Sequence, residues 1–149
     1  MSAWNFSSTV TVRTTPEVAY RELIDYTWKR GGELPPSPVI VEEGTPDGAG
    51  CHRVIPPLNI REEILEVAPP SSITYRVANP GWLRAYPVAK DSHRGQISFT
   101  SNPDGSTTIL WNVKWVALTG GELTVRTLTS VVISKLLKNL KRHLEDDTP

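Results

Sequence analysis

The segment ILWNVKWVAL, residues 109–118, places large apolar side chains on every second position. That period of two is the period of a β-strand, so the side chains of this set all point to one face of a sheet. The set is Ile109, Trp111, Val113, Trp115 and Ala117. Two indoles on one face form a large surface, which either fills a solid core or lines a cavity that holds a ligand.

The period changes after this strand, and it predicts a long amphipathic helix over about residues 122–145. Its apolar positions are spaced by three or four residues. They are Val125, Leu128, Val132, Leu136, Leu140 and Leu144, with Ile133 and Leu137 beside them. The other side carries basic residues, toward the negative end of the helix dipole: Lys135, Lys138, Lys141 and Arg142. The acidic residues 145–147 are expected to fray.

Working toward the N-terminus, the chain reads as a meander of short strands. Strands are predicted over 5–13, 39–44, 51–55, 59–68, 71–77, 93–101 and 106–118. The sequence Asn-Pro-Asp-Gly at 102–105 is its strongest hairpin signal. A helix is predicted between the first two strands, ending near Trp28, with Thr14 or Thr15 as N-cap and Pro16 in the first turn. One antiparallel sheet covered by a long helix is an α+β, two-layer arrangement.

The bulk properties narrow the class of protein. A chain of 149 residues is expected to form one domain, residues 1–149. Its formal net charge is zero, and no concentrated basic face points to nucleic acid. A single cysteine excludes an internal disulfide. The N-terminus lacks the features of a signal peptide and no apolar stretch approaches 18 residues, so we expect no transmembrane segment and a cytoplasmic location.

Four stretches carry a family resemblance: TTPEVAYREL, REEILEVAPPSSITYRV, HRGQISF and DGSTTILWNVKW. Within the second, Glu66 to Tyr75 has the pattern E-x-x-P-P-x-x-x-x-Y, the most telling piece. Over about residues 5–145 the chain resembles the START / birch-pollen-allergen (SRPBCC) superfamily, closest to its polyketide cyclase/dehydrase-like branch. The resemblance implies a helix-grip fold, a curved antiparallel sheet of about seven strands wrapped around a long C-terminal helix. It also implies a hydrophobic cavity for lipids, polyketides, sterols or similar molecules.

Several side chains are candidates for lining such a cavity. Tyr75 shares its strand face with apolar neighbours, as Trp111 and Trp115 do, and all three either pack the core or line the pocket. His93 shares strand parity with inward-looking residues and either guards the cavity mouth or is an exposed strand start. Leu128, Val132 and Leu136 are expected to form the floor on the helix.

The connection over residues 80–87 contains Trp82 and Tyr86, large aromatic side chains that must be buried against something. Three roles stay open for this segment. It forms a lid over the cavity, a contact in a homodimer, or simple surface packing.

The strand at 59–68 has an ambiguous inward face. Ile60 and Ile64 favour even positions, which would bury Glu62, whereas Leu65 and Val67 favour odd positions. A charge turned inward needs a partner or a shifted pKa. Its candidate partners are Arg61, Arg76 and Arg126.

Other motifs point to ordinary structure. The loop EGTPDGAG leads into a strand and lacks the lysine of a phosphate cradle. Cys51, His52, His93 and His143 have no metal-ligand spacing, and Asp91-Ser92-His93 are too close in sequence for a catalytic triad. We therefore expect no metal and no cofactor.

The function favoured by the sequence is binding, for carriage or sequestration, of a small hydrophobic ligand between the sheet and the C-terminal helix. The alternative is a cyclase/aromatase-like enzyme acting in the same cavity, with His93, Tyr75, Glu62 and Arg61 as acid–base candidates. A third possibility is an interaction module with a filled core.

Overall fold

The computed structural model describes residues 2–28, 40–43, 48–55, 60–79, 88–89, 92–117 and 122–146. The elements in these residues follow the predicted order of strand, helix, six strands and helix. They are β1 (Ser2–Val12), α1 (Pro16–Glu22), the π-helix η1 (Leu23–Trp28), β2 (Ile40–Glu43), β3 (His52–Ile55), β4 (Ile60–Ala68), β5 (Ser72–Asn79), β6 (Arg94–Ser101), β7 (Thr107–Ala117) and α2 (Glu122–Asp146).

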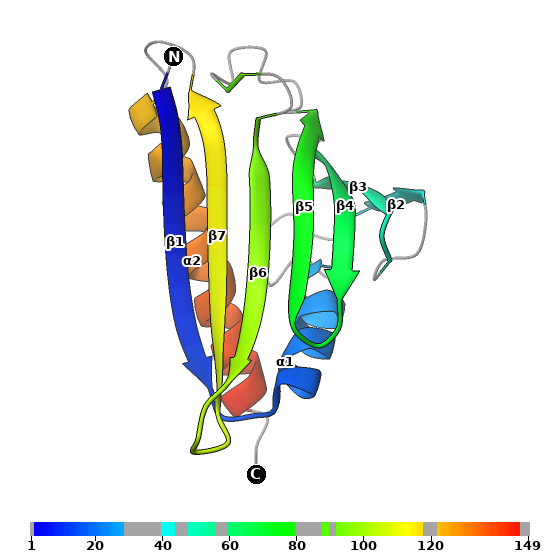
Figure 1. The fold of residues 1–149 in the computed structure, drawn as a ribbon, viewed down its shortest axis with the longest axis vertical. Coiled ribbons are helices and arrows are strands. Elements are labelled where there is room, and N and C mark those ends of the chain that lie inside the picture. Colours follow the sequence, from blue (N-terminus) through cyan, green and yellow to red (C-terminus); the bar gives the residue numbers. More distant parts are fainter. Residues whose placement is uncertain are drawn as a thin grey trace.

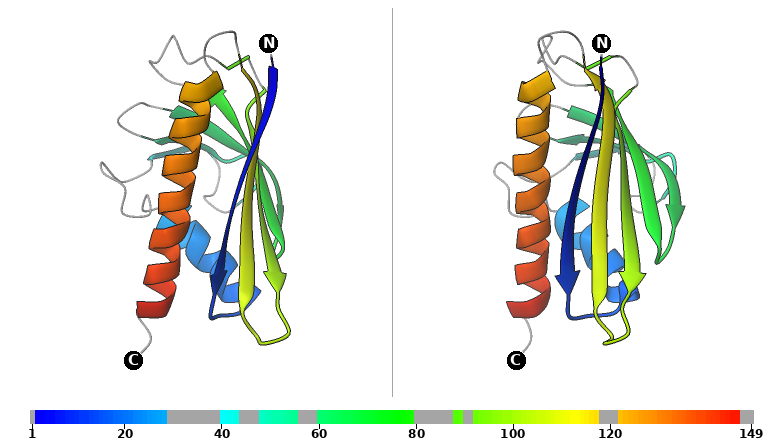
Figure 2. Two further views of the ribbon diagram at one scale, coloured as in Figure 1. Left: turned by 90° about the vertical axis from the view of Figure 1, so that its left-hand side faces the viewer. Right: turned by 60° about the vertical axis from the view of Figure 1, so that its left-hand side comes forward.

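The strands form one antiparallel sheet in the order β1-β7-β6-β5-β4-β3-β2 (Figure 1). The first strand therefore lies beside the last, and β1 and β2 are the two edges. Figure 2 shows α2 and α1 on the same face of the curved sheet, with α2 running along β1. This is the predicted α+β helix-grip arrangement.

The core lies between the concave face of the sheet and the helices. All the odd-numbered side chains of β7 from 107 to 117 are buried, as the alternation in residues 109–118 predicts. On the two strands that follow in the sheet, Ile97 and Ile73 are fully buried at matched positions. The concave face is thus apolar across the middle of the sheet.

The first helix begins as predicted. The Thr15 side chain accepts a hydrogen bond from the backbone N–H of Val18 at 3.3 Å, and Pro16 takes the first helical position. The helix continues through η1, whose last residue is Trp28. Trp28 is 1% exposed and thereby belongs to the core.

The buried face of α2 differs from the predicted one by a rotation of about one residue. Val125, Thr129, Ile133 and Leu137 face the core, whereas Leu128 and Val132 are 46% and 43% exposed. Leu128 and Val132 therefore lie beside the buried face of α2, and their place on the floor of a cavity stays a prediction. The apolar spacing pointed to them because the residue that is buried at this turn, Thr129, is polar. Leu136 and Leu144 are partly buried against the core.

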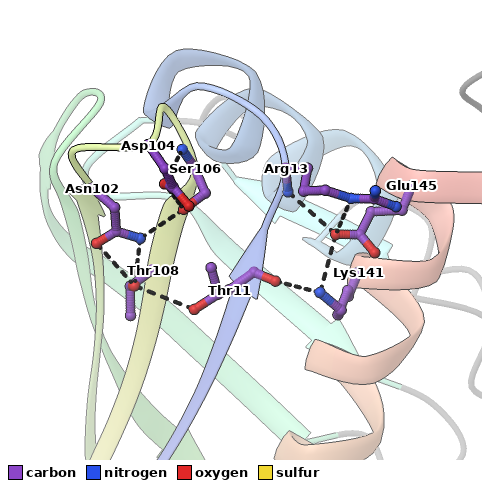
Figure 3. A network of polar contacts seen from close by, with 8 residues as sticks. All are labelled: Thr11, Arg13, Asn102, Asp104, Ser106, Thr108, Lys141 and Glu145. Atoms are coloured by element: carbon purple, nitrogen blue, oxygen red, sulfur yellow. Dashed lines mark hydrogen bonds and ion pairs between the residues drawn. The ribbon is translucent and has the colours of Figure 1, made fainter.

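The C-terminal end of α2 is held in place and does not fray at Glu145. Figure 3 shows Lys141 donating to the backbone carbonyl of Thr11, while its Nζ lies 3.0 Å from Glu145 Oε1. The backbone N–H of Arg13 donates to the same carboxylate oxygen at 3.2 Å. The hydrogen bond from Lys141 is the largest influence that lowers the pKa of Glu145. The last turn of the helix is thereby tied to the end of β1.

The predicted hairpin turn between β6 and β7 is confirmed. The Asp104 carboxylate accepts from the Ser106 backbone N–H at 2.9 Å and from its hydroxyl at 2.6 Å (Figure 3). The Asn102 side-chain amide donates to Ser106 and Thr108. Gly105 closes the turn with φ +86°, a left-handed backbone that favours glycine.

Replacing Gly105 tests how much this backbone conformation contributes. Gly105→Ala is expected to lower the free energy of unfolding by roughly 1–2 kcal/mol, because a Cβ is disfavoured at positive φ. Gly105→Asn is the matched control and should lose less, since asparagine tolerates this region. Urea unfolding of the three proteins measures the difference. Equal losses in the two variants would contradict the role of φ.

Candidate functional site

A bulge in β4 decides which charge faces inward. Ile64 pairs with Tyr75 but Glu66 pairs with Thr74, so Leu65 is the extra residue. Leu65 is 40% exposed, whereas Glu62 and Ile64 are buried on the concave side. After the bulge the odd-numbered Val67 packs toward the core. The even parity is therefore correct before the bulge and Val67 follows the odd parity after it, whereas Leu65, the bulged residue, faces outward.

The inward position of Glu62 belongs to a row of side chains that crosses the concave face. Trp115 pairs with Trp4 on β1, and its ring stacks on His93 with centroids 6.3 Å apart. The His93 carbonyl accepts from the Val77 N–H at 3.1 Å, and Val77 pairs with Glu62. We call this set the polar row, although it includes the apolar Val77. It runs Trp115–His93–Val77–Glu62–Arg53 and ends where β3 pairs with β4.

Arg53 and Glu62 form a buried ion pair at the end of the polar row. Arg53 Nη2 lies 2.7 Å from Glu62 Oε1, and the two side chains are 6% and 8% exposed. Arg53 also donates to the Trp28 carbonyl at 3.2 Å, and its guanidinium lies 3.5 Å from the centroid of the Trp28 ring. Burial lowers the pKa of Arg53, while Glu62 is the strongest influence in the opposite direction.

The partner of Glu62 is therefore Arg53 and not one of the three arginines proposed from the sequence. Arg76 instead pairs with Glu63 at 2.7 Å, on the opposite face of the sheet. Arg61 is exposed, and Arg126 lies over the ring of Trp4 at 5.9 Å. The acid–base role considered for Arg61 inside a cavity does not agree with its exposed position.

An aromatic cluster adjoins the ion pair. The ring of Trp28 meets Tyr75 edge-on at 5.3 Å and stacks on Trp111 at 6.4 Å. Trp111 Nε1 donates to the Tyr75 hydroxyl at 2.9 Å. The Trp111 N–H is thus satisfied by the Tyr75 hydroxyl, which fixes the relative orientation of the two rings.

A glycine makes room for Tyr75. Gly95 lies on β6 directly opposite Tyr75, and a Cβ at this position would be only 2.1 Å from the tyrosine Cζ. The tyrosine ring therefore lies against the bare backbone of β6. Any larger residue at position 95 would force the ring to move.

His93 is a buried histidine without a charged partner on the concave face. It is 8% exposed, and its Nδ1 has no hydrogen-bond partner within the described residues. Burial lowers the pKa of His93 to about 4, and the nearby charge of Arg94 acts in the same direction. The imidazole is therefore neutral at pH 7.

Further polar atoms on this face also lack partners in the described part of the chain. They are Trp28 Nε1, Trp115 Nε1 and Arg53 Nε. An indole N–H can only donate, and a buried donor without an acceptor costs free energy. Chemically, the concave face is an apolar surface with a neutral ion pair, a neutral imidazole and unused donors.

The sequence matches the family described as polyketide cyclase / dehydrase and lipid transport over residues 3–145. The chain belongs to this family. Its predicted resemblance to the START / birch-pollen-allergen superfamily is thereby confirmed. Comparison with curated protein sequences gave no match.

Solved structures share the fold of this polyketide cyclase / dehydrase family member at low sequence identity. A protein from Nitrosospira multiformis superposes with a TM-score of 0.75 at 14% identity, covering 97% of this chain and 98% of its own. Ara h 8.0201 gives 0.69 at 11% identity, with 93% and 98% covered. Norcoclaurine synthase from Thalictrum flavum, in complex with dopamine and hydroxybenzaldehyde, gives 0.75 at 12% identity, with 99% and 90% covered.

The structure brings four of the predicted site residues together on the concave face of this family member. Tyr75, His93, Trp111 and Trp115 are all buried there. Trp82 and Tyr86 lie outside the described residues, so the roles considered for their segment stay predictions.

Sequence reasoning missed Trp28 and Arg53. Trp28 ends a helix and has no strand parity to mark it. Arg53 could have been found from the pairing of its strand with 59–68, since it lies directly opposite Glu62. That register depends on a turn whose geometry the sequence does not reveal.

The part of the chain that is described contains no group of three or more His, Cys, Asp or Glu residues suited to hold a metal ion. None of its helices is long and apolar enough to cross a membrane.

The buried ion pair makes a prediction about stability. Arg53→Met is expected to lower the free energy of unfolding by about 3–5 kcal/mol, because it leaves the Glu62 carboxylate buried without a cation. The double variant Arg53→Met/Glu62→Leu should recover most of that loss. Urea unfolding measures both. The matched control is Arg76→Met on the other face, where the pair is more exposed and the loss should be about 1 kcal/mol. A double variant that is as unstable as the sum of its single variants would contradict this account.

The burial of His93 predicts how the stability of the protein depends on pH. Folded His93 stays neutral down to about pH 4, whereas the unfolded chain binds a proton below about pH 6.5. The unfolded state therefore binds more protons in this window, and stability falls as the pH falls from 6.5 to 4, by about 3 kcal/mol at most.

His93→Gln should remove this part of the pH dependence, and the two proteins are compared by urea unfolding at pH 7.5, 6, 5 and 4. The values at pH 7.5 serve as the reference, because His93 is neutral there in both states. An unchanged slope in the variant would show that His93 is not its source.

Proposed function

We propose that the protein binds a small hydrophobic molecule between the concave face of the sheet and α2. One observation carries this proposal: the donors Trp28 Nε1 and Trp115 Nε1 are buried between the sheet and the helices without an acceptor among the described residues. Ligand sites of small molecules are typically apolar with a few placed polar groups. A buried donor that the protein leaves unused is a natural contact for a ligand.

The proposed site is walled by Tyr75, Trp111 and Trp115, with His93 in the polar row and Leu136 on α2. Trp82 and Tyr86 stay proposed members of it. Two comparisons support the proposal. The family description includes lipid transport, and a protein of the same fold, norcoclaurine synthase, was solved with two small aromatic molecules. Burial of apolar ligand surface would drive binding, at about 25 cal/mol per Å² before the costs of association.

A cyclase-like enzyme in the same place is the second candidate, because His93, Tyr75 and Glu62 are all buried on one face. It ranks lower for two reasons. Glu62 is already neutralised by Arg53, and a histidine with a pKa of about 4 is a weak base at neutral pH.

Binding is tested with Nile red, an uncharged apolar dye, titrated into the purified protein and followed by dye and tryptophan fluorescence. We expect saturable binding with one dye per chain, and native mass spectrometry should detect the complex. The dye should also raise the thermal unfolding midpoint in a concentration-dependent way, because it binds only the folded state.

Two tryptophan substitutions make the test specific for the concave face. Val77→Trp adds an indole to the polar row and should weaken dye binding at least tenfold. The matched control, Leu65→Trp, adds the same side chain at the exposed bulge and should leave the affinity unchanged. Equal effects of the two substitutions, or no saturable binding to the wild type, would contradict the proposal.

A further inference from the structure

The donors on the concave face also restrict the class of ligand. We propose, on the basis of the function above, that the ligand is an uncharged apolar molecule that carries acceptor oxygens, and that the indole N–H groups of Trp28 and Trp115 recognise these oxygens.

The hydrogen bonds that the indoles of Trp28 and Trp115 can make run in one direction only. Trp28 and Trp115 are 1% and 2% exposed, and their Nε1 atoms have no acceptor among the described residues. An indole N–H donates and never accepts; none of the described residues satisfies these two, and an acceptor oxygen on a ligand could do so. A pure hydrocarbon would leave both donors buried and unpaired, whereas a carbonyl or ether oxygen would remove that cost.

The third indole of the cluster shows that the pattern is selective. Trp111 is as buried as the other two, but its N–H already donates to the Tyr75 hydroxyl at 2.9 Å. Within the described residues, one indole is therefore satisfied internally and two are not. Trp28 stacks on Trp111. Trp115 lies four residues further along β7 than Trp111, so the two backbone positions are about 13 Å apart at the rise of a strand. The two free donors thus serve separate parts of the face.

The charges on this face also restrict the ligand. Arg53 is the cation of the polar row, and Glu62 neutralises it at 2.7 Å. His93 is neutral at pH 7. Arg126 approaches the ring of Trp4, but its side chain is exposed and its charge stays in water. Among the described residues, a carboxylate or an ammonium group would therefore meet no unpaired counter-charge on this face, which is costly in an apolar interior.

Four probes with the same naphthalene body separate these properties. They are 2-acetylnaphthalene, an uncharged ketone; 2-isopropylnaphthalene, its hydrocarbon counterpart; 2-naphthoate; and protonated 2-naphthylmethylamine. Isothermal titration at pH 7.5 gives the four affinities. We expect the ketone to bind at least fivefold more tightly than the hydrocarbon, the gain of about one hydrogen bond. Both charged probes should bind at least tenfold more weakly than the ketone.

Phenylalanine substitutions identify the donor, because they keep an aromatic ring and remove the N–H. The double variant Trp28→Phe/Trp115→Phe should bind ketone and hydrocarbon equally well. Trp111→Phe is the matched control, since its N–H is already used, and it should keep the preference for the ketone whatever the change in both affinities. The ratio of two affinities in one protein does not depend on how much of that protein is folded.

The outcomes separate this inference from the proposed function. Equal binding of ketone and hydrocarbon to the wild type, tighter binding of a charged probe, or an unchanged preference in the double variant overturns the inference and leaves the binding function standing. Binding of Nile red without any of the four probes overturns it as well. If neither Nile red nor any probe binds, the proposed function fails together with it.

Discussion

The alternation of side chains in β7 is the constraint on which the rest of the structure depends. This strand pairs with β1 on one side and β6 on the other, and its inward face is buried along its whole length. Two indoles on that face are too large to be covered by the sheet itself. They need α2, η1 and the curvature of the sheet to bury them, so the most apolar strand also determines where the helices lie.

The interior created in this way contains charged and titratable groups but no net charge. Arg53 and Glu62 neutralise each other, and burial keeps His93 unprotonated at pH 7. Polar satisfaction is less complete among the described residues, because the indole of Trp111 has an acceptor there and those of Trp28 and Trp115 do not. The described part of the concave face is therefore electrically balanced while some of its hydrogen-bond donors lack acceptors.

The sequence was sufficient for the fold because its signals are local. A period of two, a capping threonine before proline and an Asn-Pro-Asp-Gly turn each specify their own element. The failures have non-local causes. The register of β3 on β4 selects Arg53 as a partner, the bulge at Leu65 switches the inward face, and the orientation of α2 buries Thr129 and leaves Leu128 half exposed. Tyr75, His93, Trp111 and Trp115 could be placed by parity, but Trp28 could not, since it ends a helix.

The open order of the sheet has a mechanical consequence. In a closed barrel, strand number and stagger fix the radius, and a larger guest cannot be admitted without breaking backbone hydrogen bonds. Here the described residues of β1 and β2 form the two edges and do not pair with each other. The width of the concave face is therefore set by the twist of the sheet and the position of α2, and not by a closed ring of strands. A ligand that binds there as proposed would require no backbone hydrogen bond between β1 and β2 to break.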